Sequence, residues 1–351
     1  MKTSISLPSL LVTGFIAFLF IPWPQQGSPL GTQPRSMFEL LEQAEVLKIS
    51  IETDIRSLLS ETPKDDYLPA LFSFKDALGQ EREFLAEIKP RGKYRRRVCD
   101  FPPLKLKFSS EDLIKNGLGT FNTLKLVSHC LSDEKDGKDN LLREFLAYEY
   151  YQQLTPMSYR VKLAEITYID SGKREKSFSR MAFFLEPTDE LADRLEGEEV
   201  EDFGIPLEKI EPRNSLEMRT FQYLIGNSDW DIPNLRNIKI IRHNTTGDLF
   251  AIPYDFDLAG WVDASYAVPN TNLGQFDVKD RLFIGSLPSP EAWDDCFLRF
   301  ERARSGIEAE IQSLEGLSQA SRRDILQFLS TFFNRDGKQL AKRVQGDVER
   351  A

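Results

Sequence analysis

Short stretches of alternating apolar and polar residues dominate the first half of the chain. Apolar side chains at every second position are typical of strands that bury one face. A turn at Asp76-Ala77-Leu78-Gly79 joins the first two stretches into a predicted hairpin. The predicted strands of this half are 68–74, 82–88, 104–108, 123–128, 161–169 and 179–185.

Helical periodicity marks other parts of the chain. Apolar residues spaced three and four positions apart predict amphipathic helices. The predicted helices are 37–59, 139–154, a short one through Leu195, 214–225, and a C-terminal region from 291 that is interrupted near Gly316 and Asn334. The acidic stretch 196–202 is expected to be exposed. A region 37–186 rich in strands thus precedes a mainly helical region 187–351.

An apolar run from Leu10 to Ile21 follows Lys2 and ends at Pro22-Trp23-Pro24. Its length suits the core of a signal peptide and is short for a membrane span of about 20 residues. We predict that residues 1–24 are a signal peptide or, if uncleaved, a membrane anchor facing outward. Residues 25–36, rich in Gly, Pro and Gln, are predicted to be a linker. The protein is therefore expected to be exported, as a periplasmic, extracellular or membrane-anchored protein.

The central motif surrounds another predicted hairpin, with strands at 237–242 and 249–254. Asp229 and Asn234 lie in the turn before it, and Asp255 and Asp257 lie in the turn after it. Because a hairpin brings its two ends together, these oxygen-bearing side chains are expected to lie close to one another. Such a cluster can hold a divalent metal ion and leave one carboxylate free to orient a hydroxyl group.

The spacing of these residues indicates which kind of metal-dependent chemistry the cluster suits. Asp229 and Asn234 are related as Asp-x-x-x-x-Asn, the spacing of the base and the metal-binding asparagine in a kinase catalytic loop. The segment Asp255-Phe256-Asp257 is similar to the metal-binding Asp-Phe-Gly segment that follows such a loop. The histidine and arginine that usually precede the catalytic aspartate are replaced by Asn227 and Ser228.

Basic residues in the first half suit a nucleotide phosphate site. Arg91 begins a glycine-containing basic turn, and Lys105 and Lys107 lie on one face of the predicted strand 104–108. A strand lysine can reach phosphates as a compact point charge. An exposed basic loop beside an edge strand explains the same pattern, and alternation does not choose between the two lysines.

Two acidic residues complete the predicted nucleotide site. Glu144, on the predicted helix 139–154, is a candidate partner for the strand lysine, although Arg143 is an equal candidate for a phosphate contact. Glu186 follows the strand 179–185 at a position where backbone groups of a linker would pair with adenine. That pairing leaves no side-chain signature.

Composition excludes several other functions. The net charge of −10 argues against a general nucleic-acid-binding protein, which would carry a basic face. The sequence has two histidines, His129 and His243, which lie far apart. Their number and separation argue against a His-rich zinc site and against a Ser-His-Asp triad. The three cysteines show no CxxC pairing; they allow at most one intramolecular disulfide, and we expect buried free thiols.

With these segments in order, the chain resembles the CotH kinase-like family of exported proteins from about 88 to 260. The residues that carry the resemblance are Lys89-Pro90-Arg91-Gly92, Leu104 to Phe108, Leu141 to Tyr148, Gly226-Asn227-Ser228-Asp229 with Asn234, and Ile252 to Leu258. The last two blocks are the most specific. The histidine found after the catalytic aspartate in relatives is replaced here, since Trp230 and Asp231 follow Asp229.

The resemblance implies an α+β, two-lobed protein-kinase-like fold with an antiparallel-sheet N-lobe, a mainly helical C-lobe and an extra N-terminal helix. It also implies transfer of the ATP γ-phosphoryl group to an unknown protein substrate. Asp229 would orient the acceptor hydroxyl, while Asn234 and Asp255, with Asp257 as an alternative, would bind Mg²⁺ or Mn²⁺. Lys105 or Lys107, paired with Glu144, would hold the phosphates.

Two other functions compete with a catalytic kinase. The first is a non-catalytic kinase-like protein that binds a partner or contributes to a surface layer. The second is a hydrolase that uses Asp229 and Asp231 as paired carboxylates, for example on a glycan. A glycan site normally adds exposed aromatic residues, and Trp230 and Trp261 are the nearby candidates.

Overall fold

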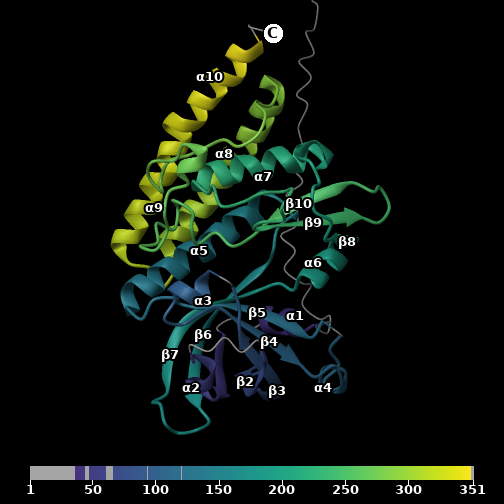
Figure 1. The fold of residues 1–351 in the computed structure, drawn as a ribbon, viewed down its shortest axis with the longest axis vertical. Helices are drawn as coiled ribbons and strands as arrows, with labels where there is room; N and C mark the ends of the chain where they lie inside the picture. Colours follow the sequence, from purple (N-terminus) through teal and green to yellow (C-terminus); the bar gives the residue numbers. More distant parts are fainter. Residues whose placement is uncertain (1–35, 44–46, 61–65, 93, 120, 349–351) are drawn as a thin grey trace, which may run out of the picture. The chain divides into compact units, whose positions relative to one another are not determined.

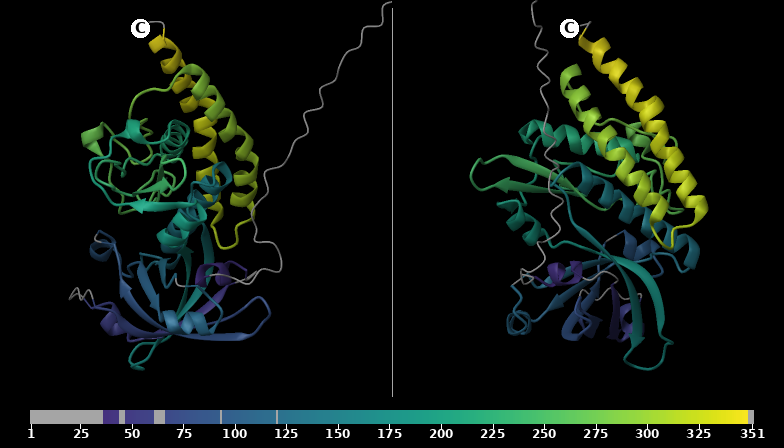
Figure 2. Two further views of the ribbon diagram at one scale, coloured as in Figure 1. Left: turned by 90° about the vertical axis from the view of Figure 1, so that its right-hand side faces the viewer. Right: turned by 180° about the vertical axis from the view of Figure 1, so that it is seen from behind.

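A closed barrel forms the first half of the described chain. The computed structural model describes residues 36–348, apart from 44–46, 61–65, 93 and 120. Seven strands follow one another around the barrel in the order β1-β2-β3-β4-β5-β7-β6; Figure 1 labels β2 to β7. They are β1 (Lys48–Thr53), β2 (Leu68–Lys75), β3 (Glu81–Pro90), β4 (Leu104–Phe108), β5 (Thr123–Val127), β6 (Val161–Asp170) and β7 (Phe178–Leu185). Figure 2 shows these strands from two further directions.

The predicted two-lobed protein-kinase-like fold with an antiparallel-sheet N-lobe and an extra N-terminal helix is wrong. The barrel is closed and mixed, because β1 pairs parallel with β6 and antiparallel with β2. The region 37–59 causes the difference: it forms α1 (Met37–Glu42), β1 and α2 (Ile55–Leu58) instead of one helix. The buried Ile49 and Ile51 alternate along β1, and ladders on both of its edges outweigh the helical spacing.

The barrel interior explains why the other strands are predictable. The inward positions of β2, β3, β4 and β7 carry phenylalanines that contact one another edge to face. The central residues are Phe72, Phe84, Phe108 and Phe184, each at most 2% exposed. Alternation in these strands therefore reflects a filled interior on one side and solvent or other elements on the other.

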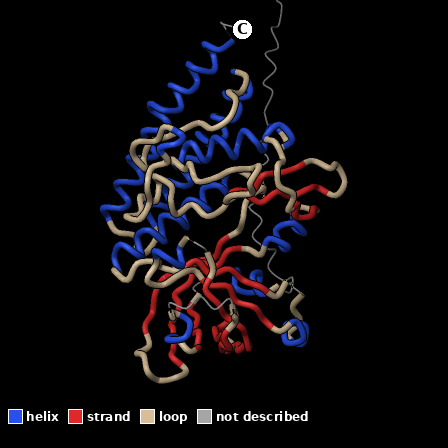
Figure 3. The backbone as a smooth tube through the Cα atoms, in the orientation of Figure 1, coloured by secondary structure: helices blue, strands red, loops and turns tan. Residues whose placement is uncertain are grey.

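A second core lies among the remaining elements. It involves α5 (Glu134–Leu154), α6 (Thr188–Arg194), α7 (Pro212–Ile225), α8 (Pro290–Ser313), α9 (Gln319–Thr331) and α10 (Gly337–Val348). Figure 3 distinguishes these helices from the strands. Helix α5 packs against α8 and α9 and also against β6 and β7.

Helix α5 precedes residue 186 in the chain but contributes to this second core. The predicted division of the chain into two parts at 186 therefore stays a prediction. The predicted leader 1–24 lies outside the described residues, as does the linker 25–36 except for Ser36.

The central hairpin is confirmed, and a third strand extends it. Strands β9 (Ile238–His243) and β10 (Leu249–Pro253) pair antiparallel. Strand β8 (Gly197–Val200) pairs with β9 and lies inside the acidic stretch predicted only to be exposed. Its Glu198 and Glu199 are neutralised across the strands by Arg242 and Lys239, so an acidic sequence is accommodated in a sheet.

A disulfide joins Cys99 to Cys130, so the expectation of free thiols is wrong for this pair. Cys296 is free and buried. Backbone pairing of Phe101 with Cys130 brings the two cysteines together across a separation of 31 residues, which their spacing alone does not reveal. The bond therefore links the turn after α3 (Arg95–Val98) to the segment that follows β5.

Removing this disulfide is expected to lower the free energy of unfolding by about 3–4 kcal/mol, because it releases a loop of this length in the unfolded chain. Chemical denaturation of wild type and of the double variant Cys99→Ser/Cys130→Ser measures the loss. Added reductant should destabilise the wild type and leave the double variant unchanged. An equal response of both proteins to reductant would contradict the prediction.

A carboxyl pair between α5 and α8 makes stability depend on pH. Burial raises the pKa of Glu149 to about 8, and the charge of Glu310 adds to the rise. The folded state therefore binds a proton at Glu149 more tightly than the unfolded state does. The resulting contribution to the free energy of unfolding is fully present below pH 4.5 and is lost as the pH rises toward 8. Relative to wild type, Glu149→Gln should gain about 3 kcal/mol of stability between pH 5 and pH 8. Urea denaturation at both values tests this; a constant difference would contradict it.

Candidate functional site

The two acidic turns meet where α7 ends. Gly226 ends α7 in the left-handed conformation, with φ of 65°. Its carbonyl accepts a hydrogen bond from the backbone N–H of Gly260, and the Trp261 N–H donates to the carbonyl of Ile225 at 2.9 Å. The turn that carries Asp229 is thus tied to the segment that follows Asp255, as the hairpin predicted.

Asp229 lies at the edge of this site. Its side chain is 34% exposed and faces Arg236 at 3.5 Å. The Asn237 side-chain amide donates to the Asp229 carboxylate at 2.9 Å and to its backbone carbonyl at 2.7 Å. Burial raises the pKa of Asp229, and the negative charge of Asp255 raises it further. Asp229 and Asp255 are therefore close enough to interact.

The amide partner of Asp229 differs from the predicted one. Asn234 is exposed, and its side chain donates to Asp231 at 2.7 Å within a local turn. Asn237, three positions further along, contacts Asp229 instead. The motif spacing pointed to Asn234 because it matches the Asp-x-x-x-x-Asn pattern. The available signal for Asn237 was its place at the start of the hairpin, beside Asp255.

Asp255 adopts an uncommon backbone conformation for a residue other than glycine, with φ of 64°. Its backbone N–H donates to the Tyr148 hydroxyl at 2.7 Å, which ties the turn to α5. The carboxylate is 35% exposed and contacts Arg95 at 2.6 Å. A strained turn that leaves a carboxylate partly open is a common feature of functional sites.

Glu144 and Asp257 lie deeper and share Arg95 with Asp255. Arg95 Nη2 is 2.9 Å from Glu144 Oε1, and its Nε is 2.9 Å from Asp257 Oδ2. Burial raises the pKa of both carboxyl groups, and Arg95 opposes that rise. The neighbouring Tyr266 also lowers the pKa of Asp257.

The predicted pairing of Glu144 with Lys105 or Lys107 is replaced by this contact to Arg95. The basic turn after β3 brings Arg95 over α5, which sequence spacing does not reveal. Arg143, the alternative phosphate contact, points to the backbone carbonyl of Val262 and to Asp324.

A row of lysines crosses three strands of the barrel. The register pairs Lys105 with Lys89 on β3 and with Lys125 on β5. Lys107 lies further along β4, half-exposed, and pairs with Glu87 at 3.7 Å. Of the two lysines on β4, Lys105 is therefore the one that lies beside the buried Lys125. Arg91, whose N–H donates to the Pro103 carbonyl at 2.7 Å, adds its charge nearby.

Lys125 is the most buried lysine of this row. Its Nζ donates to the Thr188 hydroxyl at 3.1 Å and lies 5.7 Å from the ring of Tyr254, the residue before Asp255. Burial lowers its pKa to about 7, with a further contribution from the charge of Arg91. The sequence prediction missed Lys125; the signal was a single lysine between Leu124 and Leu126 in an otherwise apolar strand.

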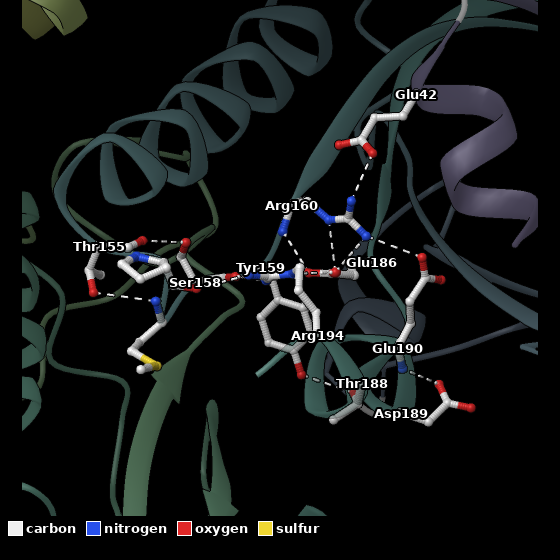
Figure 4. Close-up of polar contacts among 12 residues, drawn as sticks. Glu42, Thr155, Ser158, Tyr159, Arg160, Glu186, Thr188, Asp189, Glu190 and Arg194 are labelled. Atoms are coloured by element: carbon white, nitrogen blue, oxygen red, sulfur yellow. Dashed lines mark hydrogen bonds and ion pairs between the residues drawn. The ribbon is translucent and has the colours of Figure 1, made fainter. Parts of the chain in front are cut away.

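Glu186 belongs to a separate buried network (Figure 4). Its carboxylate binds Arg160 at 2.8 Å and Arg194 at 2.9 Å, and its backbone N–H donates to the Arg160 carbonyl. Arg160 also contacts Glu42 of α1 and Glu190 of α6. Glu186 thus joins β7, α1 and α6, and its predicted role beside adenine stays a prediction.

The acidic residues fit a magnesium site of the open kind. Within the described ranges, no three His, Cys, Asp or Glu side chains are grouped to hold a metal ion. Magnesium at phosphoryl-transfer sites keeps several waters and takes only one or two protein carboxylates, with phosphates completing the shell. Asp255, 35% exposed, is the carboxylate of this cluster that is open to such an ion, and Asp229, 34% exposed, is open in the neighbouring turn.

The tryptophans near the site lie in the core. Trp230 is 6% and Trp261 1% exposed. Neither side chain is available as a platform for a sugar ring, so the glycan-hydrolase alternative loses its aromatic support. Separately, none of the helices in the described part of the chain combines the length and apolar character needed to cross a bilayer.

Comparisons with known proteins show a remote structural similarity. No family model matches the chain, and no curated protein matches it. A crystal structure of the Helicobacter pylori proinflammatory kinase CtkA aligns with 69% of this chain and 94% of its own, at 12% identity and a TM-score of 0.41. This similarity is kinase-like at most and carries no argument about activity. The comparisons give no support to the CotH family in particular.

Proposed function

We propose that the protein transfers the γ-phosphoryl group of ATP to a hydroxyl group of a protein substrate. The observation that carries this proposal is that two partly exposed carboxylates, Asp229 and Asp255, lie in turns tied to each other, with the buried Lys125 5.7 Å from the ring of Tyr254, the residue before Asp255. Phosphoryl transfer requires mainly positioning and the neutralisation of charge, which acidic metal ligands and a lysine supply together.

Each residue has a defined part in this proposal. Asp229, oriented by Asn237, accepts the hydrogen bond of the acceptor hydroxyl. Asp255 holds Mg²⁺ or Mn²⁺, with Asp257 as an alternative ligand. When bound, the ion neutralises phosphate charge. Asn234 would join the ligands only after leaving Asp231.

Basic groups of the barrel bind the phosphates. Lys125 lies 5.7 Å from the ring of Tyr254, the residue before Asp255, and Arg91 and Lys105 add positive charge around it. Lys107 contacts Glu87 near the surface and is not assigned to the phosphate site. Thr188 keeps the Lys125 ammonium group fixed in the absence of a ligand.

We also propose that the protein works outside the cytoplasm. Two observations support export: the apolar run 10–21 and the disulfide between Cys99 and Cys130. Disulfides persist mainly in oxidising compartments. Residues 1–24 would act as a signal peptide or as a tether to the membrane.

A second candidate function is a non-catalytic binding protein. It is favoured by the position of Arg95, which already neutralises Asp255, and by Asn234, which faces Asp231. Such a protein would bind a partner without moving a phosphoryl group.

A transfer assay with γ-labelled ATP and Mg²⁺ or Mn²⁺ separates the two functions. We expect label to appear on the protein itself or as released phosphate. Lys125→Met should lower this rate at least about tenfold, because a hydrogen-bonded charge next to the phosphates is lost. Lys75→Met, an exposed strand lysine of the same barrel, serves as the matched control. Absence of transfer by wild type with either ion would favour the non-catalytic protein.

A further inference from the structure

One guanidinium group occupies the centre of the acidic site. Arg95 is 5% exposed and contacts the carboxylates of Glu144, Asp255 and Asp257 at distances of 2.6 to 2.9 Å. The three acidic residues come from α5 and from the turn after β10, whereas Arg95 comes from the basic turn between β3 and β4. A single side chain thus connects three separate parts of the chain.

Carboxyl groups outnumber the positive charge in this cluster. One positive charge faces three carboxyl groups, and a guanidinium group does not lose its proton in proteins. Arg95 can therefore be displaced from a carboxylate but not neutralised. The same Nη2 contacts Glu144 and Asp255, so it already has a second partner if Asp255 is taken by another cation.

The backbone around Arg95 is fixed at both ends. The Cys99 N–H donates to the Arg95 carbonyl at 2.8 Å, and the disulfide ties Cys99 to Cys130 after β5. On the other side, the Tyr94 hydroxyl donates to the Tyr266 carbonyl at 3.1 Å. A change of partner by Arg95 therefore requires movement of its side chain alone.

We propose that Arg95 is a positioning residue with two alternative partners. Without a ligand it serves as the internal counter-ion of Asp255; when a metal–nucleotide complex binds, Arg95 keeps Glu144 and donates its freed N–H groups to a phosphate. This inference rests on the proposed function. Arg95 thereby disfavours the bare metal ion, which competes for Asp255, and favours the metal–nucleotide complex, which brings acceptor oxygens of its own.

If Arg95 alternates between these two partners, one variant should change the affinity for Mn²⁺ and the affinity for Mn²⁺–ATP in opposite directions. Arg95→Met should bind Mn²⁺ alone about tenfold more tightly, because the competing cation is gone. The same variant should bind Mn²⁺–ATP about tenfold more weakly, because the phosphate loses a charged donor. Electron paramagnetic resonance measures free Mn²⁺ in both titrations, with and without ATP. Arg97→Met, which removes an exposed arginine from the same helix α3, should match wild type in both.

Arg95→Lys provides a second variant if the methionine variant does not fold, as checked by circular dichroism. It keeps the charge but loses the planar fork, so both affinities should shift in the same directions by smaller factors. Wild type that binds no Mn²⁺–ATP would remove the proposed function itself. Wild type that binds normally, with both affinities of the Arg95 variants lowered together or unchanged, would overturn this inference alone.

Discussion

Asp255→Asn is expected to lower the rate of phosphoryl transfer by at least about a thousandfold. The side chain keeps its shape but loses the charge that would hold the divalent ion on the phosphates, a contribution of several kcal/mol in such sites. Asparagine suits this test better than alanine, because it tolerates the φ of 64° at this position. Label transfer from γ-labelled ATP measures the rate.

The control for this variant is Asp248→Asn, the same change in the exposed turn of the same hairpin. It should leave the rate unchanged. Arg95 retains Glu144 and Asp257 in Asp255→Asn, so the free energy of unfolding should change by less than about 1 kcal/mol. A variant that folds normally and keeps more than a tenth of the wild-type rate would contradict the role given to Asp255.

The second large effect concerns stability. Glu186→Ala is expected to lower the free energy of unfolding by about 3 kcal/mol, because it leaves Arg160 and Arg194 without their shared buried carboxylate. Arg160 keeps Glu42 and Glu190, which limits the loss. Urea denaturation at neutral pH measures the difference.

Glu198→Ala is the comparison for Glu186→Ala, since Glu198 forms an exposed ion pair with Arg242. It should cost less than about 1 kcal/mol. Equal losses in the two variants would show that burial does not decide the strength of these ion pairs. If Glu186→Gln instead lowered ATP affinity with little loss of stability, Glu186 would regain its predicted place beside the nucleotide.

Local pattern was enough to predict most elements but not the closure of the barrel. Strand β4 lies at the predicted residues 104–108, and the central hairpin pairs as expected. Closure depends on β1, where Ile51 fits the helical spacing and, together with Ile49, also fits strand alternation. The partners β2 and β6 decide between them, and they lie elsewhere in the chain.

Some residues of the candidate site were likewise predictable from local pattern, and others were not. Asp229, Asp255 and Asp257 were predictable because a hairpin necessarily joins its own two ends. Arg95 and Lys125 were missed, since their positions depend on a disulfide and on strand register across the barrel. Asn237 was missed because the spacing of a familiar motif favoured Asn234.

The central claim is that the Asp255 turn and Lys125 form a metal–nucleotide site. The most direct measurement is thermal unfolding of the protein with and without Mg²⁺–ATP, because a ligand that binds only the folded state raises the midpoint. We expect a rise in wild type that requires the metal and is absent in Asp255→Asn. An unchanged midpoint of wild type at millimolar nucleotide, or an equal rise in the variant, would contradict the claim.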